Sequence, residues 1–104
     1  MSKNVRTEAV DHLFDAILKL ENKEECYAFF EDVCTVNELS ALSQRYEVAK
    51  MLREGHTYLD IANKTGASTA TISRVNRSLN YGCDGYDLVF ARLGLETKKN
   101  EEQK

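Results

Sequence analysis

Short polar side chains and two arginines share one side of a predicted helix between residues 68 and 77. The outward face of that helix carries Thr69, Ala70, Ser73, Arg74 and Arg77. A helix enters a DNA major groove, which is about 12 Å wide, only when the side chains nearest the bases are short. Hydroxyl groups can bond to base edges or phosphates, methyl groups can contact thymine, and arginines can reach phosphates. The chemistry that this pattern favours is recognition of double-stranded DNA.

The residues before that helix have the pattern of a helix-turn-helix, which would present the face to DNA. One short helix is predicted to begin after Thr57 and the next after Ser68, because both residues are good N-caps. Helices that cross steeply need a small residue at their closest approach and a residue tolerant of positive φ in the turn, which Ala62 and Gly66 supply. The residues predicted to bury the pair are Ile61, Ala67, Ile72 and Val75. The alternative is a plain helical hairpin with Gly66 only as a C-cap, but it does not predict the short outward side chains.

Polar residues around the second helix complete the predicted interface. Thr57, at a helix N-terminus, can bind a phosphate through its backbone N–H and its hydroxyl, and Lys64 is long enough to reach one. The predicted DNA-binding residues are Thr57, Lys64, Ser68, Thr69, Ala70, Ser73, Arg74 and Arg77. For each of them the alternative is a solvated polar side chain that caps or flanks a helix.

Positive charge is concentrated where this motif lies, although the whole chain has a formal net charge of −3. Residues 1–40 contain four basic and nine acidic side chains, residues 41–79 contain six and three, and residues 80–104 contain four and five. Electrostatic attraction acts over about 8 Å at physiological salt, so local charge matters more than the total. The middle segment is therefore expected to attract phosphates.

The rest of the sequence is expected to form helices that hold the motif. The 104 residues include no proline and only five glycines, and apolar residues recur at helical spacing, which predicts an all-α fold of six helices. The first predicted helix spans 8–20. Capping boxes at Asn22 with Glu25 and at Thr35 with Glu38 predict the next two, which reach Val33 and Gly55. The others span 57–65 and 68–79, and a last helix, whose start Asp84 and Asp87 suit, ends before Gly94. The third helix is the expected scaffold, with one apolar face formed by Leu39, Leu42, Tyr46, Ala49 and Leu52.

The expected organisation is one helix-turn-helix domain over residues 7–94, preceded by an N-terminal arm at 1–6. Residues 95–104 are charged and lack a pattern, which predicts a disordered tail. Amphipathic helices in so small a chain are expected to complete their core against a second copy, in a homodimer.

Several classes of function lack their characteristic residues here. The three cysteines share no CxxC spacing and follow no secretory leader, which indicates reduced thiols that pack in a cytoplasmic protein; they are Cys26, Cys34 and Cys83. The two histidines lie far from any ligand cluster, so no metal or other cofactor is expected. No apolar run is long enough to span a bilayer. No catalytic set or glycine-rich phosphate loop is recognisable, which argues against an enzyme.

The sequence resembles the Trp repressor family and, within it, the YerC/YecD group of Trp repressor-like proteins. The resemblance covers about Val10 to Leu93 and is most specific in three places: Ala41-Leu42 with Arg45, Gly66-Ala67, and residues 70–74 with Ser78-Leu79. It implies an all-helical, intertwined homodimer whose two recognition helices project one DNA turn apart, each reading half of an operator.

The resemblance also implies an effector pocket, in which two arginines clamp tryptophan between the third helix and the recognition helix. The positions that match the pocket are Thr35, Arg45, Thr71, Arg74, Val75 and Ser78. Val75 stands where the family has a glycine that leaves room for the indole, and overpacking of this kind costs about 1 to 3 kcal/mol. Tryptophan is therefore not expected to be the effector, and no other effector is identified. Alternatively, Arg45 and Arg74 contact phosphates or acidic residues of the same subunit.

The predicted function is a sequence-specific DNA-binding protein that regulates transcription, in the manner of a repressor. Two alternatives remain open. One is a helical protein-interaction module that uses residues 1–40 and 86–93. The other is a DNA-binding protein that acts outside transcription, for example in replication initiation or transposition, because the motif indicates docking and not its consequence.

Overall fold

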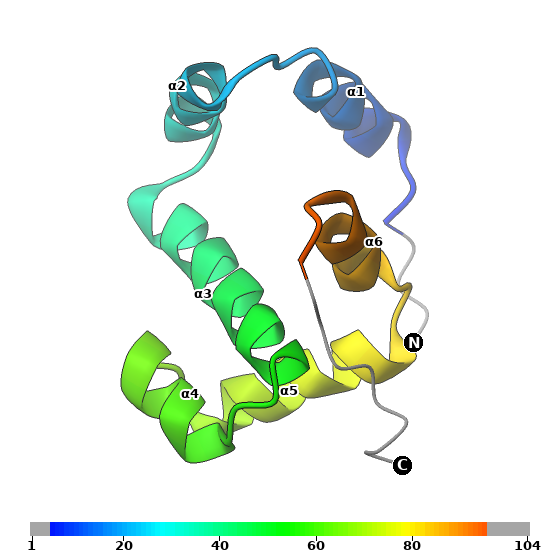
Figure 1. The fold of residues 1–104 in the computed structure, drawn as a ribbon. Coiled ribbons are helices and arrows are strands. Elements are labelled where there is room, and N and C mark those ends of the chain that lie inside the picture. Colours follow the sequence, from blue (N-terminus) through cyan, green and yellow to red (C-terminus); the bar gives the residue numbers. More distant parts are fainter. Residues whose placement is uncertain (1–4, 96–104) are drawn as a thin grey trace. The chain divides into compact units, whose positions relative to one another are not determined.

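The computed structural model describes residues 5–95, and in that range the chain forms six α-helices and no strand (Figure 1). The helices are α1 (Glu8–Ile17), α2 (Lys23–Val33), α3 (Val36–Arg53), α4 (Tyr58–Thr65), α5 (Thr69–Tyr81) and α6 (Gly85–Arg92). The all-α prediction is confirmed, and each predicted helix is present. The first predicted helix is shorter than expected, because the chain turns tightly after Ile17, with Leu20 N–H donating to the Ile17 carbonyl at 3.1 Å.

The described chain divides into two compact units, one up to residue 39 and one from residue 40 onward. The first unit begins its helices with the caps that the sequence predicts. Asn22 Oδ1 accepts from Glu25 N–H at 2.9 Å, and Glu25 Oε1 accepts from Glu21 N–H at 2.8 Å. Thr35 and Glu38 cap α3 reciprocally, at 3.0 and 2.9 Å. Each bond satisfies a backbone donor that a helix end leaves without a partner.

Although its helices are well capped, the first unit has no buried residue between residues 5 and 39. Across residues 8–17 and 23–33 no residue is buried. The exposed apolar side chains of this unit are Val5, Leu13, Phe14, Leu18, Tyr27, Val33 and Val36. Helices of this length are marginally stable in water without an apolar partner surface.

The second unit contains the hydrophobic core. Its α4 and α5 lie across the C-terminal end of α3, and α6 follows α5 (Figure 1). The buried apolar residues come from all four helices and from the turn after α4: Val48, Ala49, Met51, Ile61, Ala67, Ile72, Val75, Leu79 and Phe90. This core holds the helix-turn-helix segment against the scaffold.

The apolar face predicted for α3 is only partly correct. Of its five residues Ala49 alone is buried, whereas Leu42 is exposed and Tyr46 and Leu52 are half-buried. The buried positions of α3 are Val48, Ala49, Met51 and Arg53. A single stripe assumes one partner surface, but α3 shares its core with residues from three other helices, so burial extends around it.

Two further expectations differ from the structure. Leu95, placed at the start of the predicted tail, is half-buried against the core and donates its N–H to the Phe90 carbonyl at 3.0 Å. Residues 96–104 and residues 1–4 lie outside the described part of the chain.

Cys26 and Cys83 were expected to pack, yet both are exposed and Cys34 is half-buried, and all three are free thiols. Cys26 lies on α2, which buries nothing, and Cys83 lies in the turn before α6.

The turn between α5 and α6 depends on a close approach at Gly82, which generates a stability prediction. Gly82 N–H donates to the Ser78 carbonyl at 2.9 Å, and a Cβ at Gly82 would clash with that carbonyl oxygen. We expect Gly82→Ala to lower the free energy of unfolding by about 1 to 3 kcal/mol. Gly85→Ala is the matched control, because a Cβ there has no heavy atom within 4 Å. Urea denaturation at equal protein concentration checks this, and equal stabilities of the two variants would contradict it.

Candidate nucleic-acid interface

The interface is built on the turn between α4 and α5. Gly66 ends α4 in the left-handed conformation, at φ +75°, and its N–H donates to the Ala62 carbonyl at 2.9 Å. Thr65 Oγ1 donates to the Ile61 carbonyl at 2.7 Å and accepts from Ala67 N–H at 3.1 Å. Because the left-handed region favours glycine, the predicted role of Gly66 in the turn is confirmed.

Burial orients α5 as predicted. Ile61, Ala67, Ile72 and Val75 are all buried, and Ala62 is half-buried against the same core. The outward residues Thr69, Ala70, Ser73, Arg74 and Arg77 are all exposed. One helix therefore has an apolar side fixed to the core and a side of short polar residues and arginines that faces solvent.

Capping uses some of the hydroxyl groups that were predicted to contact DNA. Thr57 Oγ1 accepts from Asp60 N–H at 3.1 Å. Ser68 Oγ accepts from Thr71 N–H and forms a second hydrogen bond with Thr71 Oγ1, both at 3.1 Å. A serine hydroxyl has one donor and two acceptor positions, so Ser68 has little capacity left for a base edge. Thr69 and Ser73 have no such cap contact in the described residues, and both residues are exposed.

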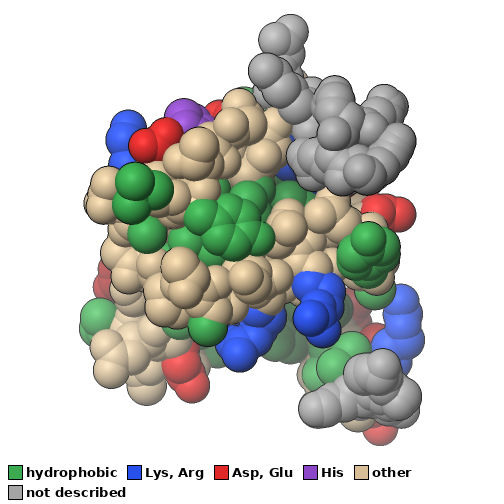
Figure 2. All heavy atoms as spheres, turned by 90° about the horizontal axis from the view of Figure 1, so that it is seen from below, with side chains coloured by type: hydrophobic (Ala, Val, Ile, Leu, Met, Phe, Trp, Pro, Cys, Tyr) green, Lys and Arg blue, Asp and Glu red, His purple; other side chains and the backbone are tan. Residues whose placement is uncertain are grey.

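The electrostatics of this face favour an anion. The first turn of α5 carries no acidic residue, and the N-terminal end of a helix is its positive end. Within the described residues, no carboxylate lies within 4 Å of a guanidinium nitrogen of Arg74 or Arg77. Seen from below Figure 1, the face over α4 and α5 is largely uncharged, with Lys and Arg side chains in its lower half (Figure 2).

Lys64 belongs to a different local environment from the outward face of α5. It lines an open cleft of about 380 Å³ between α3 and α4, together with Glu47 and Gln44. Gln44 Nε2 donates to the carbonyl of Thr65, another residue of the cleft, at 3.1 Å. Lys64 remains exposed, so the structure leaves its ammonium group accessible to a phosphate.

The residues of the implied effector pocket differ in how the chain uses them. Arg45, Arg74 and Ser78 are exposed and Thr71 is half-buried. Thr35 lies in the first compact unit and caps α3. Val75 is only 2% exposed, with its side chain in the core. In the described residues neither Arg45 nor Arg74 forms an ion pair with a carboxylate, so the same-subunit pairing considered for them is not present.

One charged residue of the motif region was missed by the sequence analysis. Arg53, counted among the six basic side chains of residues 41–79, is buried and paired with Asp87 of α6. The positive charge on the surface of that segment is therefore smaller than the sequence count. Arg53 follows Ala49 by four residues, which places it on the buried side of α3, and that spacing is the signal that could have identified it.

Metal binding has no support in the described residues, where no group of three or more His, Cys, Asp or Glu side chains is arranged to hold an ion. None of the helices between residues 5 and 95 has the length and apolar character that a membrane span requires.

Comparisons with known proteins agree on one family. The family model for the Trp repressor protein matches residues 8–94. YerC of Bacillus subtilis strain 168, an uncharacterized protein, is 54% identical over 100 residues, which is 96% of this chain and 95% of YerC.

Two crystal structures share the fold. One is a TrpR-like protein from Eubacterium eligens ATCC 27750, with 72% identity and a TM-score of 0.86, covering 89% of this chain and 97% of that one. The other is a proposed Trp repressor from Staphylococcus aureus, with 58% identity and a TM-score of 0.87, covering 90% and 94%.

Proposed function

The chain belongs to the Trp repressor protein family, and on that premise we propose that it is a cytoplasmic, sequence-specific DNA-binding protein that regulates transcription. The observation that carries the proposal is the outward face of α5. It combines short side chains that can approach base edges with arginines that can reach phosphates, on a helix fixed by a buried apolar side. No catalytic step is part of the proposal.

Within this proposal the contacts divide into two roles. Arg74 and Arg77 contact phosphates or base edges, while Thr69, Ala70 and Ser73 read the sequence. Thr57 and Lys64 contribute backbone contacts at the edge of the interface. Ser68 acts mainly through the N-terminus of α5, because its hydroxyl is already hydrogen-bonded to Thr71. These roles are separable by mutation, since phosphate contacts act on all sequences and base contacts do not.

The DNA-binding proposal predicts different effects for an arginine and a threonine of α5. We expect Arg77→Ala to weaken binding to every duplex. It should also reduce the steepness of the plot of log affinity against log salt by about the amount that one phosphate contact contributes. We expect Thr69→Ala to change the preference among duplexes and leave the salt slope unaltered. Gel shifts over a salt series, on duplexes selected by the unmodified protein and on scrambled ones, measure both quantities.

Arg92→Ala is the matched control for these gel shifts, because it removes an exposed arginine of α6 outside the interface. Unchanged affinity and preference in both α5 variants would contradict the assigned face. Salt-insensitive binding, or no binding to duplex DNA by the unmodified protein, would favour a protein-interaction module.

We further propose that the functional form is a homodimer, because α1 and α2 bury no residue within one chain. Phe14 is 54% exposed and Leu13 is also exposed, while Val10 and Ile17 of the same helix are only half-buried. A second copy that covers these helices would complete their core and would supply the second recognition helix for the other half of an operator.

The dimer proposal predicts a mass of about twice 11.8 kDa in light scattering at micromolar concentration. We expect Phe14→Glu to shift the mass toward that of a monomer, because it would bury a charge without a partner. Leu59→Glu is the control, since Leu59 is 70% exposed on α4, outside the first unit, and its replacement should leave the mass unchanged. If the unmodified protein is monomeric at these concentrations, the two-half-site arrangement is refuted.

We also propose that tryptophan is not the effector, and Val75 carries this proposal. Its side chain fills space in the core beside α3 instead of leaving an opening next to α5. Arg45 and Arg74 stay exposed and can attract a carboxylate, but they cannot compensate for a ring that has no room.

Calorimetry should therefore detect no tryptophan binding to the unmodified protein at physiological concentration. Val75→Gly should admit the ligand if the rest of the pocket is intact, and binding should appear as heat and as a raised melting temperature. Val75→Gly also removes buried methyl groups from a helix, so it should be less stable than the unmodified protein in the absence of ligand. Tight binding of tryptophan by the unmodified protein would overturn the steric argument.

A further inference from the structure

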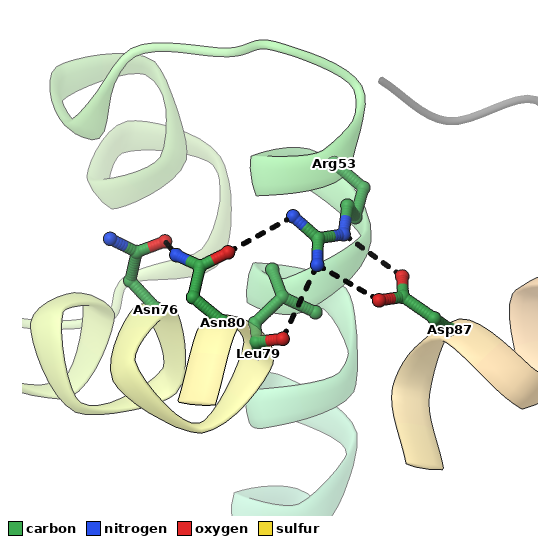
Figure 3. Close-up of polar contacts among 5 residues, drawn as sticks. All are labelled: Arg53, Asn76, Leu79, Asn80 and Asp87. Atoms are coloured by element: carbon green, nitrogen blue, oxygen red, sulfur yellow. Dashed lines mark hydrogen bonds and ion pairs between the residues drawn. The ribbon is translucent and has the colours of Figure 1, made fainter. Parts of the chain in front are cut away.

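Among residues 5–95, Arg53 is the charged residue that is buried, with 3% of its surface exposed. Its guanidinium makes a two-pronged ion pair with Asp87 of α6, with Nε at 2.9 Å from Oδ1 and Nη2 at 2.8 Å from Oδ2 (Figure 3). Such a paired geometry fixes the plane of the guanidinium as well as its distance from the carboxylate.

Two further N–H donors of Arg53 bond to α5. Nη2 donates to the carbonyl oxygen of Leu79, and Nη1 donates to Asn80 Oδ1, each at 3.2 Å. Asn80 Nδ2 donates in turn to Asn76 Oδ1 at 3.1 Å, one turn earlier along α5 (Figure 3). One side chain of α3 thus holds the C-terminal half of α5 and the start of α6 through directional bonds.

The N-terminal half of α5 is held differently. Ile72 and Val75 are buried there, but contacts between apolar side chains have no preferred direction. Apolar packing keeps α5 on the core, and in its C-terminal half the hydrogen bonds of Arg53 add directional contacts to the burial of Leu79. Arg77, one residue after Asn76, lies on the part of α5 that these bonds hold.

Stability alone does not account for this arrangement. Removing two charges from water costs energy that their attraction only partly offsets, and apolar residues of similar volume are often as stabilising as a buried ion pair. The directional bonds of Arg53 to two other helices can in addition restrict the angles between the three helices. Replacing Arg53 and Asp87 by apolar residues should therefore remove the directional bonds to α5 without lowering the free energy of unfolding.

We propose that Arg53 is a positioning residue for DNA recognition, which sets the orientation in which α5 presents its outward face. This inference rests on the proposed DNA binding. Base contacts require the side chains of α5 to match base edges closely, while phosphate contacts tolerate displacement. Loss of the Arg53 bonds should therefore reduce discrimination between sequences and leave electrostatic binding to any duplex nearly intact.

The test is the double variant Arg53→Met with Asp87→Leu, compared with the unmodified full-length chain. The ratio of affinities for a selected duplex and a scrambled duplex is measured at one salt concentration, with the salt slope and the melting temperature of each protein. We expect a melting temperature equal to or above that of the unmodified protein, an unchanged salt slope, and a ratio lower by about tenfold or more, which corresponds to at least one lost base contact.

Two further variants complete the experiment. Arg53→Lys keeps the positive charge, but an ammonium group cannot make the paired hydrogen bonds of a guanidinium to Asp87. Its ratio of affinities for the selected and the scrambled duplex should therefore also fall, which keeps the test valid even if the double variant does not fold. Glu54→Gln is the matched control, because Glu54 directly follows α3 and contacts Lys50 and His56, each at 3.5 Å, and neither contact involves α5. This variant should keep the full ratio of affinities.

The outcomes are distinguishable. If the unmodified protein binds the selected and the scrambled duplex with equal affinity, the DNA-binding proposal and this inference are both overturned. If the unmodified protein prefers the selected duplex, and Arg53→Lys and the double variant keep the same ratio of affinities, only the positioning role is overturned.

Discussion

The constraint on which the rest of the structure depends is the burial of one side of α5. Ile72, Val75 and Leu79 recur three and four residues apart, so they occupy one stripe of the helix and all enter the core. Once that stripe is buried, the short polar residues and the arginines must face solvent. The turn at Gly66 allows α4 to close the other end of the same core without displacing α5. The candidate interface is thus a consequence of packing.

Two kinds of interaction hold this arrangement, and they have different consequences. Apolar burial provides most of the attraction but little direction, so it determines which side of α5 faces outward and not its exact angle. The bonds from Arg53 to Asp87, Asn80 and the Leu79 carbonyl provide direction. The first unit illustrates the opposite case: α1 and α2 are capped, but none of their residues is buried in the described part of the chain, which is why the functional account includes a second copy.

Local features of this fold could be predicted from sequence because they involve residues three or four positions apart. The caps at Asn22, Thr35 and Ser68 and the turn at Gly66 are of this kind, and each forms as predicted. The outward face of α5 followed from the same periodicity.

What could not be predicted depends on contacts between distant residues. Arg53 and Asp87 are 34 residues apart, and nothing at the level of periodicity pairs them; Asp87 was expected only as an acidic residue at the start of a helix. Likewise, a stripe on α3 cannot reveal that three helices share its core, so Leu42 was wrongly placed inside. Exposure of Cys26 has a similar origin, because helical spacing alone does not reveal that α2 buries none of its residues.

The central claim is that the outward face of α5 docks with DNA, and mapping of amide chemical shifts in solution tests it most directly. The ¹⁵N-labelled protein is titrated with a duplex that it selects from a random pool. The account predicts that the largest shifts fall between residues 68 and 77 and around Thr57, with small shifts in α1 and α2. Shifts concentrated in α1 and α2, or none in α5 at saturating duplex, would contradict it.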